Sequence, residues 1–172
     1  ISCFGSSDGA IDLTISGSVP TYSYQWSSGE TTEDITNLSY GVYFVTITDI
    51  NSCVHNVSVS LTQPSPLITY TTSLPVSCYD SLNGGISLIV SGGVSIYTYF
   101  WSNAPGTPPL SSSNQNITNI PAGTYYVSVT DLNGCLAYDT ATVVEPTPLI
   151  SSIQSVYDYN GYDISCIGYS DG

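Results

Sequence analysis

The sequence predicts an all-β protein of tandem immunoglobulin-like antiparallel β-sandwich domains. Short runs of alternating apolar and polar residues recur, separated by turns rich in Gly, Asn, Asp and Pro, and neither repeat shows a convincing helical period. The opening nonapeptide, residues 1–9, returns with substitutions at 76–84 and at 164–172. A recurrence of this kind is typical of repeat proteins, so the chain is expected to be a segment of an array.

Four clear strands are expected in the first repeat. A half-buried strand over 10–16 precedes an aromatic strand over 22–26, and two longer strands over 41–48 and 53–61 are joined by a tight reversal. Alternate positions on these strands are expected to face the core: Ile11, Leu13, Ile15, Tyr22, Tyr24, Trp26, Tyr43, Val45, Ile47, Val57, Val59 and Leu61.

The second repeat follows the same plan with one insertion. Cys3 and Cys78 are 75 residues apart, whereas Cys53 and Cys135 are 82 apart, which places seven extra residues after Trp101 in a surface loop. Segments with Pro at alternate positions end each repeat and are expected to be stiff. The predicted division is a first sandwich at 1–68, a linker at 69–75, a second sandwich at 76–150, a linker at 151–163, and the first strand of a third repeat at 164–172.

The charge balance excludes several kinds of partner. The chain has no Lys or Arg against 13 Asp and Glu, a formal charge of −13. Nucleic acid is therefore not expected as a partner, and docking on an anionic membrane surface is disfavoured. No apolar run is long enough to span a membrane, so membrane insertion is not expected. Paired cysteines in small repeated units instead favour an extracellular location.

Two cysteine pairings respect the repeat. One lies within each unit, Cys3–Cys53 and Cys78–Cys135; the other crosses the linker, Cys53–Cys78 and Cys135–Cys166. We favour the first, on the assumption that the final hairpin of a unit lies beside its first strand, and each bond would then contribute about 4 kcal/mol. Cys166 would pair with a later repeat. No Cys-x-x-Cys pair supports a zinc site.

Both repeats carry one series of motifs. In the first they are Ser2-Cys-Phe-Gly-Ser-Ser-Asp-Gly9, Tyr22-x-Tyr-x-Trp26, Gly41-Val-Tyr43 and Thr48-Asp49 with Cys53; in the second, Ser91-Gly-Gly93, Tyr97-x-Tyr-x-Trp101, Gly123-Thr-Tyr125 and Thr130-Asp-x-Asn-Gly-Cys135. This series closely resembles the SprB-type repeat of Bacteroidetes cell-surface and gliding-motility adhesins. The second copy departs from it at Asp80 and in its inserted loop. The resemblance implies an immunoglobulin-like module of large secreted surface proteins, without catalytic residues.

Three aspartates are the candidates for a metal site. Asp8, Asp49 and Asp131 are expected near the ends of units, where converging carboxylates could hold Ca²⁺. Their spacing matches no calcium-loop motif, and turn chemistry is the favoured interpretation. No cofactor is therefore expected, with Ca²⁺ as the alternative.

Aromatic side chains and one histidine are the remaining candidates for a binding or catalytic role. Trp26 and Trp101 could stack on sugars if they were exposed, but their alternation with tyrosines favours the core. His55 has no identifiable nucleophile near it in the sequence, so no enzymatic activity is expected.

Five residues are candidates for glycosylation. Asn37, Asn56 and Asn116 begin N-x-Ser/Thr triplets. The resemblance to Bacteroidetes proteins adds Thr140 and Ser81, because O-glycosylation in that group favours Asp followed by Ser or Thr and an apolar residue.

These features predict a non-enzymatic structural repeat that forms a rod or fibre on a bacterial surface or shed from it. A carbohydrate- or surface-binding adhesin module is the alternative. The expected partners are neighbouring repeats or copies of the chain, with surface glycans for the alternative. Assembly could proceed by continuation of the chain or by addition of the segment 164–172 to a neighbouring unit.

Overall fold

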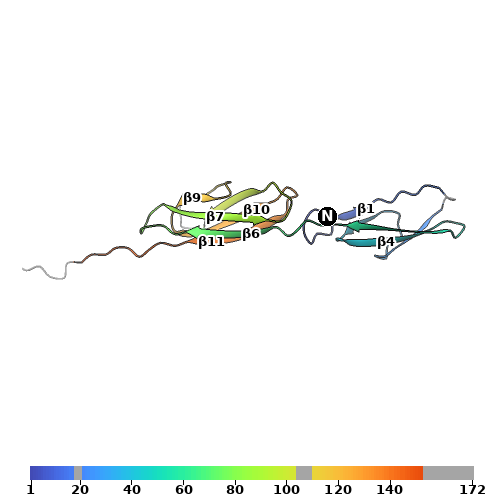
Figure 1. The fold of residues 1–172 in the computed structure, drawn as a ribbon, viewed down its shortest axis with the longest axis horizontal. Helices are drawn as coiled ribbons and strands as arrows, with labels where there is room; N and C mark the ends of the chain where they lie inside the picture. Colours follow the sequence, from blue (N-terminus) through green and yellow to red (C-terminus); the bar gives the residue numbers. More distant parts are fainter. Residues whose placement is uncertain (18–20, 104–109, 153–172) are drawn as a thin grey trace, which may run out of the picture.

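The computed structural model describes residues 1–17, 21–103 and 110–152. These residues form eleven strands and no helix, so no helix among them could cross a membrane. The strands form two units that lie end to end in an elongated molecule (Figure 1). We call residues 1–62 unit 1 and residues 67–144 unit 2. The predicted all-β fold of antiparallel sheets is confirmed.

Unit 1 contains two antiparallel sheets. Strands β2, β4 and β5 form the larger sheet in that order, and β1 pairs with β3 in the smaller one. The strands span Gly9–Ile11 (β1), Ser23–Trp26 (β2), Ile35–Leu38 (β3), Gly41–Thr48 (β4) and Val54–Leu61 (β5).

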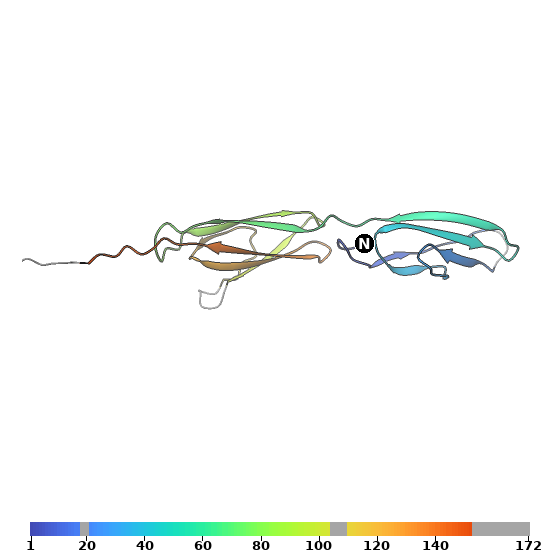
Figure 2. The same cartoon turned by 90° about the horizontal axis from the view of Figure 1, so that it is seen from below.

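Unit 2 contains two three-stranded antiparallel sheets. One has the order β11-β10-β8 and the other β6-β7-β9. The strands span Ile68–Leu74 (β6), Gly84–Ser91 (β7), Thr98–Asn103 (β8), Ile117–Ile120 (β9), Gly123–Thr130 (β10) and Leu136–Val143 (β11). The two sheets face one another as separate layers (Figure 2).

Each unit packs around one tryptophan. Trp26 is 2% exposed and Trp101 is fully buried, which confirms their assignment to the core. Both indoles keep a hydrogen-bond partner there: Trp26 Nε1 donates to Thr32 O at 2.8 Å, and Trp101 Nε1 donates to Asn114 O at 2.9 Å. Burial therefore leaves neither indole N–H unsatisfied.

The predicted linker at 69–75 is wrong. Residues 68–74 form β6, which pairs with β7 along its whole length, from Ile68↔Ser91 to Leu74↔Gly85. This segment alternates apolar and polar residues as a strand does, and prolines lie outside it, Pro64 and Pro66 before it and Pro75 after it. The fold boundary consequently lies before the strand, about ten residues ahead of the cysteine motif that marks the sequence repeat. The predicted linker at 151–163 falls almost entirely, and the third repeat wholly, outside the described residues.

The predicted strand at 10–16 is much shorter in the structure. In unit 1 only β1, Gly9–Ile11, is formed, whereas its counterpart β7 has eight residues. β7 is lined by β6, but no described strand occupies that position beside β1. Leu13 and Ile15 still pack against the core. The alternating pattern therefore fixes which side chains turn inward, while the missing neighbour limits the hydrogen-bonded strand.

The first residues of unit 1 lie beside its last strand. The Ile1 amino group donates to Thr62 O at 3.4 Å, and Gly5 N donates to Gln63 Oε1 at 2.8 Å. The hairpin between β4 and β5 is at the opposite end, because each strand has eight residues and so spans roughly 25 Å. In unit 2 the equivalent hairpin, residues 131–135, faces unit 1.

Candidate functional site: the disulfide-bonded junction

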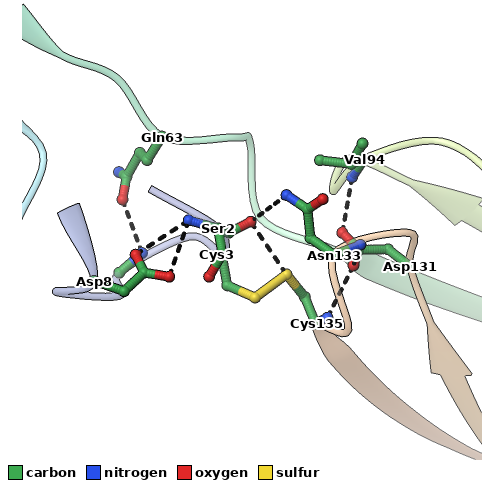
Figure 3. The surroundings of a disulfide bond; sticks show 9 residues. Ser2, Cys3, Asp8, Gln63, Val94, Asp131, Asn133 and Cys135 are labelled. Carbon is green, nitrogen blue, oxygen red and sulfur yellow. Dashed lines mark hydrogen bonds between the residues drawn. A yellow bond between two sulfur atoms is a disulfide. The ribbon is translucent and has the colours of Figure 1, made fainter. Parts of the chain in front are cut away.

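A disulfide between Cys3 and Cys135 joins the two units (Figure 3). It connects the opening turn of unit 1 to the hairpin between β10 and β11 of unit 2. The predicted pairs Cys3–Cys53 and Cys78–Cys135 are therefore wrong, as is the prediction of one disulfide within each unit. Cys53 and Cys78 are free and exposed. The predicted partnership of Cys166 with a later repeat lies outside the described residues.

The predicted pairs are wrong because the final hairpin and the first cysteine lie at opposite ends of a unit. The predicted pairs assume that the final hairpin of a unit lies beside that unit's first strand. In the structure Cys3 lies near the end of β5, so the length of that eight-residue strand separates it from Cys53. A disulfide requires Cα atoms within about 7 Å, and the Cα atoms of Cys3 and Cys135 are 5.7 Å apart. The opening turn of one unit thus meets the hairpin of the next unit.

Hydrogen bonds across the junction accompany the disulfide. Asn133 Nδ2 in unit 2 donates to Ser2 O in unit 1 at 2.8 Å. Ser2 N in turn donates to the Asp8 carboxylate at 3.1 and 3.2 Å. Ser2, next to Cys3, and Asn133, two residues before Cys135, are therefore each held within their own turn and also bonded to one another across the interface (Figure 3).

The connecting segment is seated on a glycine turn of unit 2. Gly93 N donates to Ser65 O at 2.9 Å. A Cβ on Gly92, whose φ is +76°, would lie 1.8 Å from Pro66 O. Position 92 therefore requires glycine, because another residue would be strained at this φ and its Cβ would collide with Pro66 O. The Gly-Gly of the repeat motif thereby allows the connection to pass directly over unit 2.

Asp131 holds the hairpin that carries Cys135. Its Oδ1 accepts hydrogen bonds from Asn133 N and Cys135 N at 2.9 and 2.8 Å, and its Oδ2 accepts one from Val94 N at 2.8 Å. The side chain is 5% exposed. The Val94 N–H makes the largest contribution to lowering the pKa of this carboxyl below its ordinary value, and the hairpin N–H groups add to it against the opposing effect of desolvation.

Unit 2 should therefore lose stability in acid through Asp131. Because its folded-state pKa lies below the unfolded value, the stabilisation is fully present above about pH 4 and is lost as the pH falls through the folded pKa. We expect Asp131→Asn to lower the melting temperature at pH 7 and to flatten its decline below pH 4. Thermal unfolding monitored by Trp101 fluorescence in a Trp26→Phe background measures this.

Asp80→Asn serves as the matched control, because Asp80 is an exposed aspartate of unit 2 whose φ of +57° is also readily adopted by Asn. An Asp131→Asn variant with the acid profile of the Asp80→Asn protein would contradict the assignment.

The three calcium candidates lie in turns at two separate places, the junction and the far end of unit 1. Asp8 and Asp131 lie at the junction, while Asp49 lies in the hairpin at the far end of unit 1, where its Oδ1 accepts hydrogen bonds from Asn51 N and Cys53 N. Among the described residues, no three His, Cys, Asp or Glu side chains are grouped so as to hold a metal ion. The hydrogen bonds described above for these three carboxylates are those of turn residues.

A pocket at the far end of unit 1 contains residues that sequence reasoning kept apart. Asp49, Cys53 and His55 line it together with Tyr22 and Ile47. The proximity of Cys53 to His55 was missed, because the sequence placed Cys53 in a disulfide. Residues two apart near the start of a strand share a face, which was the available signal.

Four of the glycosylation candidates are exposed, and Ser81 is half-buried. Asn56, Asn116 and Thr140 form hydrogen bonds to neighbouring residues at less than 3 Å. Asn56 Oδ1 accepts from Thr46 Oγ1 at 2.8 Å, and Asn116 Oδ1 accepts from Leu88 N at 2.9 Å. Thr140 N donates to Asp139 Oδ1 at 2.8 Å. The Asn116 contact ties the Oδ1 of that amide to β7 and leaves Nδ2, the atom that an N-linked glycan modifies, outside this bond.

An aromatic patch on the outer face of unit 2 was not anticipated. Phe100 on β8, Tyr126 on β10 and Tyr138 on β11 are 56%, 45% and 71% exposed and line one shallow surface pocket. Ser128 of β10 pairs with both Phe100 and Tyr138, so those two rings flank it across the sheet. Alternation along the strands was the available signal, because these residues occupy positions between the inward-facing ones, such as Trp101 and Tyr125.

Residues 1–31 and 70–106 match the model of the SprB repeat. These two stretches, one in each unit, are therefore similar to the SprB repeat. The second match begins within β6, as expected if the folded unit starts before the cysteine motif. The SprB repeat is associated with cell-surface adhesins. No curated protein matches the sequence.

This chain also has matches among solved structures, at TM-scores below 0.5. An amphioxus IgVJ-C2 molecule has 16% identity and a TM-score of 0.38, covering 81% of this chain and 97% of that one. The N-terminal eight immunoglobulin domains of Down Syndrome Cell Adhesion Molecule isoform 1.30.30 have 16% identity and a TM-score of 0.37, covering 82% of this chain and 21% of that one.

Proposed function

We propose that this chain is a non-enzymatic, extracellular structural segment whose SprB repeats form a stiff rod on a bacterial surface or shed from it. The observation that carries the proposal is the junction. A disulfide, the Asn133–Ser2 hydrogen bond and the seated connection from Ser65 to Leu67 all link the same two ends. Three separate links between the same two ends restrict bending, which a flexible tether would not require.

The composition supports an exposed, extracellular setting. A formal charge of −13 keeps rods apart in solution, and the disulfide suits an oxidising environment. The match to the SprB repeat supports a surface location, and the Bacteroidetes origin rests on the same resemblance.

Antibodies against unit 2 test the location on intact cells of the source organism. We expect labelling of unpermeabilised cells and of filaments seen by electron microscopy in the culture medium. Antibodies against a cytoplasmic protein are the control for cell integrity. Labelling that appears only after permeabilisation would refute the proposal.

Glycan binding is the second candidate function, and the aromatic patch of Phe100, Tyr126 and Tyr138 favours it. Exposed rings on a flat sheet are suited to stacking on the apolar faces of sugars. The tryptophans do not contribute, because both are buried. Binding of the chain to a glycan array, compared with a Phe100→Ala/Tyr138→Ala variant, tests this function. Equal signals from the two proteins would eliminate the patch as a binding site.

A further inference from the structure

We propose that Cys78 and Cys53 are two halves of further disulfides of the same kind as Cys3–Cys135. Cys78 bonds the hairpin cysteine of the SprB repeat that follows unit 2, and Cys53 bonds the opening cysteine of the repeat that precedes unit 1. This inference rests on the proposed rod-forming function and extends it, since every junction of the rod would then be covalently closed.

The opening turn of unit 2 is built as that of unit 1 is. Cys78 O accepts a hydrogen bond from Ser81 N at 3.2 Å, as Cys3 O accepts one from Ser6 N at 3.1 Å. Ser77 N donates to Asn83 Oδ1 at 3.0 Å, in the place of the Ser2–Asp8 contact. Asp80 N donates to Glu145 Oε2 at 3.1 Å, in the place of the Gly5–Gln63 contact. Cys78 is therefore presented at the outer end of unit 2 as Cys3 is at the junction.

The hairpin of unit 1 likewise reproduces that of unit 2. Asp49 Oδ1 accepts from Asn51 N and Cys53 N at 2.9 and 2.8 Å, the same two distances that Asp131 makes with its own hairpin. Asn51 is the counterpart of Asn133, whose side chain bonds across the junction to Ser2 O. The far end of unit 1 thus offers both the thiol and the amide that unit 2 uses.

An exposed leucine points independently to a neighbour beyond unit 2. Leu67, in the segment that crosses the junction, packs against the core of unit 2. Its counterpart, 82 residues later, is Leu149, which is fully exposed together with most of Ile150. The segment that follows unit 2 therefore has the residues for the same crossing but no unit to pack on in this structure.

Both thiols are accessible for the chemistry, because Cys53 and Cys78 are exposed. With oxidised glutathione as the oxidant, one cysteine thiolate attacks a glutathione sulfur and releases one glutathione thiolate. The second cysteine thiolate then attacks the mixed disulfide at the protein sulfur and releases the other. Two protein thiols are oxidised to one disulfide, and one glutathione disulfide is reduced to two thiols.

Complementary single-cysteine variants test the proposal. The full chain is prepared in a Cys166→Ser background, with Cys53→Ser or Cys78→Ser added, and each is incubated with a glutathione redox buffer in about 0.5 M NaCl to screen repulsion between acidic chains. We expect the mixture of the two variants to give at least ten times more disulfide-linked dimer than either alone. The chain with both cysteines should give a ladder of oligomers on a non-reducing gel.

A tandem protein, residues 1–163 followed by 1–172, distinguishes the source of the partner. In this protein Cys53 of the first copy, Cys78 of the second copy and Cys166 are replaced by serine. If the neighbouring repeat belongs to the same polypeptide, the remaining Cys78 of the first copy bonds Cys53 of the second within one molecule and no ladder forms. A ladder that persists identifies a second molecule as the partner. Either result supports the disulfide. Full maleimide labelling of both cysteines in every preparation would overturn it, as would Cys78–Cys78 dimers as abundant as the mixed dimer. Neither failure would alter the surface labelling that tests the proposed function.

Discussion

Replacing Trp101 with alanine is expected to destabilise unit 2 by about 3–5 kcal/mol. Trp101 is completely buried and packs among residues of both sheets, including Ile86, Tyr125 and Val127. Its indole N–H also satisfies Asn114 O. The substitution removes the largest apolar surface in this core and leaves a cavity too well enclosed to collapse. Because natural domains are stable by only about 5–15 kcal/mol, most of the stability of unit 2 should be lost.

The two units allow the effect to be localised. Trp26 becomes the single tryptophan in the Trp101→Ala variant, so its fluorescence reports urea unfolding of unit 1 while far-ultraviolet circular dichroism reports both units. We expect an early transition in the dichroism signal and an unchanged fluorescence transition. Phe100→Ala, on the outer face of the same strand, is the control and should cost less than about 1 kcal/mol. A shift of both transitions together would show that the two cores are not independent.

Removing the junction disulfide is expected to have a comparable effect. The bond closes a segment of 132 residues, for which the chain-entropy model gives about 4–5 kcal/mol. A Cys3→Ser/Cys135→Ser protein should therefore unfold at lower urea concentration, with the larger change in unit 2, whose closing hairpin the bond anchors. Serine preserves the size of the side chain, so the change isolates the cross-link.

The same variant should also lose rigidity between the units. Only the Asn133–Ser2 hydrogen bond and the seated connection would remain of the links described above. Small-angle X-ray scattering should show a shorter average maximum dimension and a less rod-like pair-distance distribution. Cys53→Ser/Cys78→Ser, which leaves the bond intact, is the control. Identical unfolding and scattering of the two double variants would show that the disulfide contributes neither stability nor rigidity.

Local pattern predicted the strands well, because alternation fixes which side chains turn inward whatever the neighbouring strands are. Trp26 and Trp101 were correctly placed in the core for that reason. β6 was missed because the cysteine motif marks a repeat in the sequence, and a repeat can be divided at any point of its period without changing the pattern. The shortness of β1 depends on a neighbouring strand, which no local pattern contains.

The junction could not be derived from single-unit reasoning. The sequence identifies Cys3 and Cys135 as counterparts of Cys78 and Cys53, but which pair bonds depends on the end of the sandwich at which each lies. One wrong assumption, that the last hairpin lies beside the first strand, reversed that assignment. Positions exposed on outer strand faces, such as Tyr138, were passed over because they contribute nothing to a core.

Peptide mapping of the unreduced protein tests the covalent junction most directly. The chain has no Lys or Arg for trypsin, and pepsin has the further advantage of cutting at low pH, where thiolates are scarce and disulfide exchange is slow. After free thiols have been alkylated, mass spectrometry of the digest should find a linked pair of peptides that contain Cys3 and Cys135. Linked pairs of Cys3 with Cys53 and of Cys78 with Cys135 would contradict the account.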